Sequence, residues 1–147
     1  MTQPNDTDIP RVYTPQDVES RIYSFWEKGG YSTAKVVPGK QPFVIIMPPP
    51  NVTGELHLGH ALTASLEDIL ARWHRMMGDP TLWLPGKDHA GIATQWVVEQ
   101  QLAQEGISRQ ELGREKFLER VWQWVGKYGN TIDEQYKRMG TSFDWSR

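Results

Sequence analysis

The sequence of 147 residues contains no cysteine, which excludes disulfide frameworks, zinc sites built from thiolates and cysteine nucleophiles. It also lacks any run of about 18 consecutive apolar residues, so no membrane-spanning helix is predicted. Basic residues are not in excess, because 16 lysines and arginines stand against 18 acidic residues and the formal net charge is −2. A nucleic-acid interface that depends on one dominant basic field is therefore not predicted for this segment.

Several familiar site signatures are missing as well. The dinucleotide fingerprint Gly-x-Gly-x-x-Gly and the nucleophile elbow Gly-x-Ser-x-Gly do not occur. A P-loop would need a glycine five positions before the Gly-Lys pair at 86–87, and Thr81 stands there. The first residues, Met-Thr-Gln-Pro-Asn-Asp, are polar and form no apolar signal-peptide centre, so we expect the cytoplasm as the location.

The composition is that of a globular domain, with 38% hydrophobic and 23% charged residues. Short apolar segments at 43–47 and 82–84 predict two buried strands, and a segment of helical periodicity follows each of them. Two successive strand–turn–helix units predict a parallel α/β sheet with right-handed crossovers. Ligands bind beyond the carboxyl ends of such strands, so the loops 48–60 and 85–91 are expected to line one crevice.

The helices of these two units are expected at about 61–77 and 92–104. Before them we predict a loose arm over 1–13 and a helix that begins at Thr14-Pro15 and ends at Gly29-Gly30.

The last part of the chain is predicted to be helical. Ser108 and Glu111 can form a capping box, and a helix rich in charged and aromatic residues follows over 114–128. A break is expected at Gly129-Asn130, with a further helix over 131–139. The helix 114–128 carries two apolar stripes, and the second is expected to pack on polypeptide beyond the end of this sequence. The stripes are Phe117, Val121, Trp124 and Tyr128, and then Leu118, Trp122 and Val125.

The segment 43–60 holds the strongest functional signal. Its strand is followed by three prolines, by Thr53-Gly54 and by His57-Leu-Gly-His60 at the start of a helix. Free N–H groups and the helix dipole favour an anion at such a position, which predicts a phosphate site. Imidazole N–H donors there would suit the negative charge that develops during phosphoryl or nucleotidyl transfer.

Other interpretations of these residues remain open. One histidine could cap the helix while the other packs in a polar turn, and the Asp88 carboxylate could cap the helix that begins near Gly91. Asp88 could instead hold an ammonium group or ribose hydroxyls. His57, His60, Asp88 and His89 could meet around a metal. However, His-x-x-His lacks the glutamate and the spacing of helical zinc proteases, so no protein-bound metal is predicted.

His57-Leu-Gly-His60 resembles the first signature, His-Ile-Gly-His, of the class I aminoacyl-tRNA synthetases. Further segments resemble the valyl branch of that family, and the resemblance covers about 13–147. They are Pro-Pro-Pro-Asn-Val-Thr-Gly at 48–54, Pro-Gly-Lys-Asp-His-Ala-Gly-Ile-Ala-Thr-Gln at 85–95, and the segments 113–120, 128–129 and 144–147. The resemblance implies an α/β fold, the first half of a Rossmann-like parallel-sheet catalytic domain with helical N-terminal and C-terminal extensions.

The resemblance also implies a division into domains and an activity. Residues 1–42 would form an arm and helix, and 43–147 the truncated first half of the nucleotide-binding catalytic domain. The whole enzyme would activate valine with ATP, bound with Mg²⁺, release pyrophosphate and pass the valyl group to tRNA. It would be monomeric and independent of membranes.

Site residues follow from the same resemblance. His57 and His60 would be catalytic and contact the ATP phosphates, and Gly59 would let the adenine approach the helix. Asp88 would bind the α-ammonium group of valine, with the ribose as its other possible partner. Thr53 and Gly54 would also bind ATP, and Pro48, Pro49 and Asn51 would form part of the valine pocket. The signature motif comprises Pro50, Asn51, Val52, Thr53, Gly54, Glu55, Leu56, His57, Leu58, Gly59 and His60.

The family's second signature, Lys-Met-Ser-Lys-Ser, does not occur in these residues. It is expected to follow Arg147, together with the editing domain and the anticodon-binding helices, and the chain alone is expected to be inactive in tRNA charging. Two alternatives stay open. One is a small nucleotidyltransferase that shares His-x-Gly-His, and the other is a nucleotide-binding module without catalysis.

Overall fold

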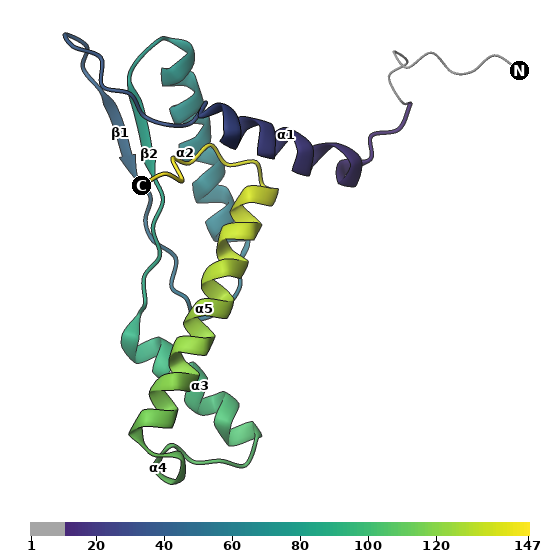
Figure 1. Ribbon diagram of the computed structural model, residues 1–147, viewed down its shortest axis with the longest axis vertical. Helices are drawn as coiled ribbons and strands as arrows, with labels where there is room; N and C mark the ends of the chain where they lie inside the picture. Colours follow the sequence, from purple (N-terminus) through teal and green to yellow (C-terminus); the bar gives the residue numbers. More distant parts are fainter. Residues whose placement is uncertain (1–10) are drawn as a thin grey trace, which may run out of the picture.

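The computed structural model describes residues 11–147, so ten residues of the expected arm lie outside the description. In chain order the elements are α1 Pro15–Gly29, β1 Phe43–Ile46, α2 Leu58–Met76, β2 Thr81–Leu84, α3 Gly91–Gln104, α4 Arg109–Leu112 and α5 Arg114–Arg138. Figure 1 shows β1 and β2 side by side, α2 and one end of α5 beside them, α3 and α4 at the other end of α5, and α1 projecting outward. None of the helices within 11–147 has the length and apolar character to cross a membrane.

The two strands confirm the predicted parallel pairing. Their register runs from Phe43 opposite Thr81 to Ile46 opposite Leu84. The helix between them is α2, so the unit is strand, helix, parallel strand. The pairing continues past the strands, because Met47 N–H donates to the carbonyl oxygen of Leu84 at 3.1 Å. The carboxyl ends of both strands therefore point toward the same end of the molecule (Figure 1).

The core has two parts, and α5 contributes to both. The larger cluster lies between the sheet, α2 and α5. It comprises the buried residues Met47, Val52, Ala64, Ala71, Trp83, Ile132, Tyr136 and Phe143. The smaller cluster joins Val98 and Leu102 of α3 to Phe117 of α5. Burial of each large apolar side chain contributes about 1.5–3 kcal/mol, so these contacts fix α5 against both the sheet and α3.

The expected break at Gly129-Asn130 is wrong, because α5 runs without interruption from Arg114 to Arg138. Gly129 is buried, and a Cβ atom built there would lie 3.8 Å from Lys87 Nζ. That distance is an ordinary van der Waals contact, so alanine would fit there and the glycine costs the helix about 1 kcal/mol relative to alanine. The helix continues because Ile132 and Tyr136, beyond the glycine, are buried in the core. Thr131 caps no second helix, since its hydroxyl donates to the carbonyl of Lys127 at 3.0 Å.

Other helix ends agree with the sequence more closely. The capping box before α4 is confirmed, because Glu111 N–H donates to Ser108 Oγ at 3.2 Å and Ser108 N–H donates to Glu111 Oε2 at 2.9 Å. For α1, Thr14 is the N-cap residue but makes no side-chain capping bond, and Gly30 ends the helix in the left-handed conformation, with φ 62°. The helix expected from residue 61 begins three residues earlier, at Leu58.

Helix α1 and the connector after it are joined to the C-terminal segment. The Tyr23 hydroxyl donates to the carbonyl of Thr141 at 2.9 Å and accepts from Trp145 Nε1 at 2.7 Å. Asp144 is buried, and its Oδ2 atom accepts the N–H of Ala34 at 2.9 Å. Bonds to this carboxylate lower the pKa of Asp144, although its burial opposes the shift. These contacts pack α1 and the residues after it against the chain end.

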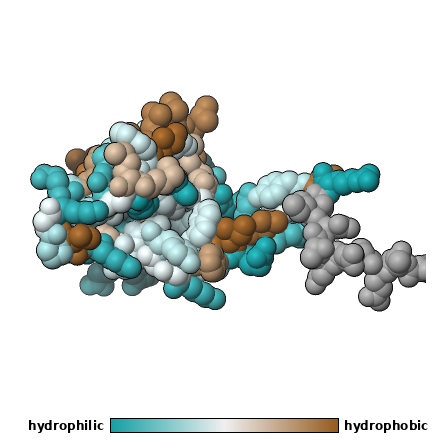
Figure 2. All heavy atoms as spheres, turned by 90° about the horizontal axis from the view of Figure 1, so that it is seen from above, coloured by the Kyte–Doolittle hydropathy of each residue, from teal (hydrophilic) through white to brown (hydrophobic). Residues whose placement is uncertain are grey.

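One face of α2 is exposed and apolar. Its side chains recur every three or four positions, on the side away from the buried Ala64 and Ala71. We call this set the α2 outer face: Leu58, Leu62, Leu66, Ile69, Trp73 and Met76, each between 50% and 85% exposed. Hydrophobic side chains also gather at the molecular surface in Figure 2. On α5, Leu118 and Trp122 of the second stripe are exposed, by 40% and 62%.

Candidate functional site

Two loops meet at the carboxyl ends of the strands. We call residues 47–57 the first loop and residues 85–90 the second loop. Asp88 N–H donates to the carbonyl of Pro50 at 2.9 Å, and Val52 N–H donates to the carbonyl of Asp88 at 3.0 Å. These bonds form a parallel bridge between Asn51 and Asp88. The ladder confirms that the two loops lie side by side, and the crevice that they are expected to line stays a prediction.

The two histidines of the signature cap the start of α2. Gly59 N–H donates to His57 Nδ1 at 3.1 Å, and His57 N–H donates to His60 Nδ1 at 3.2 Å. This arrangement is a reciprocal capping box in which imidazoles replace the usual serine and glutamate. The ring centroids lie 3.9 Å apart. The capping interpretation was therefore right, and it applies to both histidines.

Capping also determines what each imidazole presents outward. A neutral imidazole has one nitrogen that accepts and one that donates. Because Nδ1 of both rings accepts a backbone N–H, the proton of each neutral ring lies on Nε2. Burial lowers the pKa of His60 below its usual value, and the neighbouring His57 lowers that pKa further. Near neutral pH the His60 ring is thus a neutral N–H donor in the first turn of α2.

Gly59 is required by the ring of His57. A Cβ atom at position 59 would lie 2.9 Å from Cε1 and 3.0 Å from Nδ1 of that imidazole. The resemblance assigned this glycine to the approach of an adenine, and that assignment stays a prediction. The structure adds a reason inside the protein, because only glycine leaves the imidazole its place over the first turn of α2.

The Asp88 carboxylate is divided between two environments. Its Oδ1 atom accepts the N–H of Ala90 at 2.8 Å, just before α3 begins. The alternative in which Asp88 caps that helix is wrong, because Ala90 is the N-cap residue and α3 has no side-chain capping bond. Within the described residues its Oδ2 atom has no hydrogen-bond partner, and the side chain is exposed. One oxygen therefore orders the loop while the other is free to accept a hydrogen bond from a ligand.

Ala90 carries backbone strain beside this carboxylate. Its φ of 44° makes it the single non-glycine residue in the left-handed region across 11–147. That conformation costs an L-residue about 1–2 kcal/mol. The bond from Ala90 N–H to Asp88 helps to hold it, and strain of this kind clusters at ligand sites.

The remaining predicted residues of the signature and of the valine pocket fall into two groups. Pro50 and Val52 are buried and Leu56 is half-buried, so these three hold the loop in place. Half-buried or exposed positions remain available to a ligand, and at Gly54 an added Cβ would meet nothing within 4 Å. This second group is Pro48, Pro49, Asn51, Thr53, Gly54, Glu55 and Leu58.

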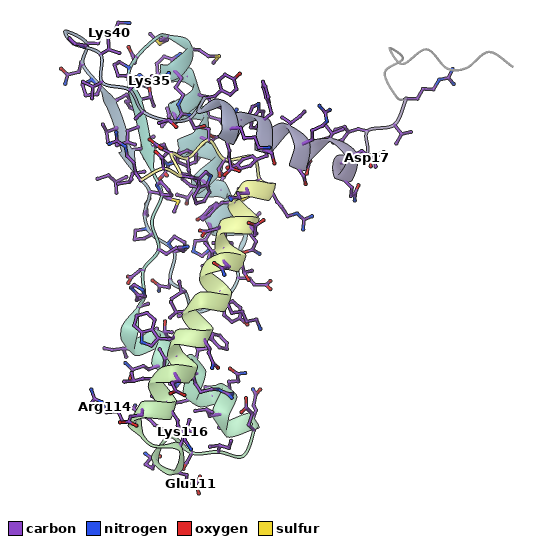
Figure 3. The ribbon with its side chains drawn as sticks, viewed as in Figure 1. Asp17, Lys35, Lys40, Glu111, Arg114 and Lys116 are labelled. Atoms are coloured by element: carbon purple, nitrogen blue, oxygen red, sulfur yellow. The ribbon has the colours of Figure 1, made fainter. Side chains whose placement is uncertain are left out.

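The histidines and acidic residues do not assemble around a common point. Across residues 11–147 no group of three or more His, Asp or Glu side chains has the proximity to hold a metal ion. His89 lies against Trp122, with ring centroids 5.9 Å apart. Figure 3 labels Lys35 and Lys40 at one end of the molecule and Arg114 and Lys116 at the other, so these charges lie away from the loops.

Sequence reasoning missed the contacts of α5 with both loops. Trp124 Nε1 donates to the carbonyl of Val52 at 3.0 Å, and Leu56 N–H donates to Gln135 Oε1 at 2.8 Å. On the second loop, Lys87 Nζ donates to an oxygen of Asp133 at 2.6 Å. The partners lie 46 to 79 positions apart, so no local pattern could reveal them. Only the apolar stripe that includes Trp124 indicated which side of this helix faces inward.

Known proteins resemble this chain in sequence. The chain is 58% identical over 140 residues to a valine–tRNA ligase of Dehalococcoides mccartyi, which covers 95% of this chain and 16% of that protein. It is 61% identical over 129 residues to the chloroplastic/mitochondrial valine–tRNA ligase 2 of Arabidopsis thaliana, covering 88% of this chain and 13% of the relative. The chain thus spans only 13–16% of the length of these relatives.

A solved structure agrees in fold. It is the ternary complex of Agrobacterium radiobacter K84 agnB2 LeuRS with tRNA and LeuAMS, with a TM-score of 0.68 at 15% identity, over 92% of this chain and 15% of that one. The family profile described as tRNA synthetases class I (I, L, M and V) matches residues 21–147. The chain belongs to the class I tRNA synthetases of this I, L, M and V group.

Proposed function

We propose that this chain is the amino-terminal part of a valine–tRNA ligase. The observation that carries the proposal is the identity of 58% with a protein of that name over 95% of the chain. The imidazole donors at the start of α2 and the free Asp88 oxygen in the neighbouring second loop support it, because activation of an amino acid needs sites for phosphate and for ammonium.

In the proposed reaction the valine carboxylate attacks the α-phosphorus of ATP. The bond between the α-phosphorus and the bridging oxygen breaks, pyrophosphate leaves, and valyl-adenylate results. The tRNA then takes the valyl group and AMP is released. Negative charge grows on the phosphate oxygens during the first step. Donors held in place before the reaction, such as the Nε2–H groups of His57 and His60, stabilise that charge most in the transition state.

The site residues have different tasks in this proposal. Asp88 would accept the valine ammonium through Oδ2, because its Oδ1 is occupied by Ala90. Pro48, Pro49 and Asn51, which are exposed in the first loop, would form part of the valine pocket. Thr53, Gly54 and Gly59 would line the ATP site. Mg²⁺ would enter bound to the nucleotide phosphates, and the imidazoles would face those phosphates as N–H donors and not as metal ligands.

The partners and setting follow from the same proposal. They are valine, ATP and tRNA, in the cytoplasm, with a monomeric whole enzyme. Residues 1–42 would form an arm and helix ahead of a catalytic half-domain at 43–147. A small nucleotidyltransferase is not favoured, because the chain matches 13–16% of much longer relatives.

The test is amino-acid-dependent exchange of pyrophosphate into ATP, catalysed by the full-length protein. Valine should support exchange best, with isoleucine and leucine near background. Threonine should act weakly, since an apolar pocket discriminates poorly against a near-isosteric side chain. Exchange that depends on another amino acid, or on none, would refute the proposal.

A further inference from the structure

We propose that α5 positions the two halves of the site through separate bonds. Gln135 bonds Leu56, the residue before His57. Asp133 pairs with Lys87, the residue before Asp88. Gln135 and Asp133 are positioning residues, since neither would touch a substrate. The inference rests on the proposed function and concerns how this chain supports it. It predicts that the two residues affect different substrates.

The first loop needs an attachment beyond the ladder between the loops. That ladder ends at Val52, and His57 lies five positions further along the chain. Gln135 supplies the attachment, because its side-chain oxygen accepts the N–H of Leu56 at 2.8 Å. This bond lies one residue before His57, the N-cap of α2. A shift at Leu56 would therefore move the imidazole donors directly.

The second loop is attached through Lys87. Its Nζ atom donates to Asp133 Oδ2 at 2.6 Å and to the carbonyl of Gly129 at 3.3 Å. The Lys87 and Asp133 side chains are only 35% and 29% exposed. Successive side chains of an extended segment point to opposite sides. Because the Lys87 side chain points toward α5, the side chain of the next residue, Asp88, points away from α5.

The geometry of α5 explains how one helix serves both loops. Ile132 and Tyr136, four positions apart, are buried at 0% and 3% exposure and fix the helix on the core. At about 100° per residue, Asp133 and Gln135 lie roughly 80° to either side of that buried stripe. Residues two apart on a helix do not face one another, so each reaches a different loop.

The experiment measures pyrophosphate exchange by the full-length enzyme carrying Asp133→Asn or Gln135→Met. Asp133→Asn should raise the KM for valine about fivefold and leave the KM for ATP within twofold. Gln135→Met should lower kcat or raise the KM for ATP about fivefold, with the KM for valine unchanged. Gln135→Glu keeps an acceptor oxygen and should restore most of the loss.

The matched control is Lys137→Met. It removes another ion pair of α5, with Glu27 of α1 at 3.4 Å, which contacts neither loop. The charge-swapped pair Lys87→Glu with Asp133→Lys should recover the KM for valine that either change alone impairs. The inference is overturned if each α5 variant changes the KM for valine and the KM for ATP by the same factor, or if both variants behave like the control.

Hydrogen exchange separates this inference from the proposed function. Backbone amides of 86–91 should exchange faster in Asp133→Asn, with those of 54–60 unchanged. In Gln135→Met the amides of 54–60 should exchange faster, with those of 86–91 unchanged. If the unmodified enzyme shows no valine-dependent pyrophosphate exchange, the proposed function is refuted. The two hydrogen-exchange patterns still test the positioning in that case. Equal protection of both loops in all variants would refute the positioning alone.

Discussion

Replacement of Gly59 by alanine should separate stability from activity in the full-length protein. The added Cβ would lie 2.9 Å from Cε1 and 3.0 Å from Nδ1 of the His57 ring, closer than such atoms normally approach. The ring must therefore move, and the bond of 3.1 Å from Gly59 N–H to His57 Nδ1 is lost. Loss of a helix cap costs about 1 kcal/mol, and alanine regains about the same amount through its helix propensity.

The net change in the free energy of unfolding should thus be close to zero, whereas the imidazole donor is displaced. Removal of one preorganised donor to a developing oxyanion typically lowers the rate by about a hundredfold or more. We therefore expect Gly59→Ala to slow valyl-adenylate formation by about two orders of magnitude at nearly unchanged stability.

The assay is single-turnover formation of the adenylate at saturating ATP and valine, alongside urea denaturation. Gly126→Ala is the matched control, because a Cβ at that exposed glycine of α5 meets nothing within 4 Å, the backbone there has no positive φ, and Gly126 is not one of the proposed site residues. An activation rate for Gly59→Ala within threefold of the control would show that the imidazole does not serve the reaction from this position.

The other predictions concern charge, pH and exposed surface. Asp88→Asn should keep the bond to Ala90 through its amide oxygen, yet raise the valine dissociation constant about tenfold or more, as measured by calorimetry. If ATP binding weakens instead, Asp88 binds the ribose. His60 has a lowered pKa, so the unfolded chain binds its proton more readily, and stability should fall as the pH drops below about 6.5. Urea midpoints from pH 7.5 to 5 should fall less in His60→Gln, and equal slopes would contradict this. Residues 1–147 expressed alone should self-associate and bind ANS through the α2 outer face. The double variant Leu62→Glu with Leu66→Glu should reduce self-association and ANS binding more than Trp122→Glu does. A monomer by light scattering that binds no ANS would refute the role of the α2 outer face.

The parts of the fold that depend on local pattern could be predicted from the sequence. The β-branched run at 43–46 and the apolar run at 82–84 gave two strands, and their order along the chain gave the parallel sheet. The capping box at Ser108 and Glu111 followed from spacing alone. The first loop and Asp88 were expected to meet, since parallel strands end at one edge of a sheet, and backbone bonds join them.

Features that depend on distant contacts could not be predicted in this way. Gly129 has the local character of a helix end, but Lys87 packs against it, and α5 continues. Gln135 and Asp133 look like ordinary polar positions until the fold brings the loops beside them. The capping role of both histidines was underestimated, because imidazoles rarely replace serine and glutamate at a helix start.

The ladder between the two loops has a consequence for how amino-acid preference can change. The bonds that set the loop spacing join the main chain of Met47 to Leu84 and that of Asp88 to Pro50 and Val52. Main-chain bonds survive most changes of side chain. Substitutions at exposed positions such as Pro48, Pro49 and Asn51 can therefore reshape the proposed valine pocket while the spacing of the two loops stays constant. Evolution could retune such a pocket in single steps, without rebuilding the scaffold that places the reacting atoms.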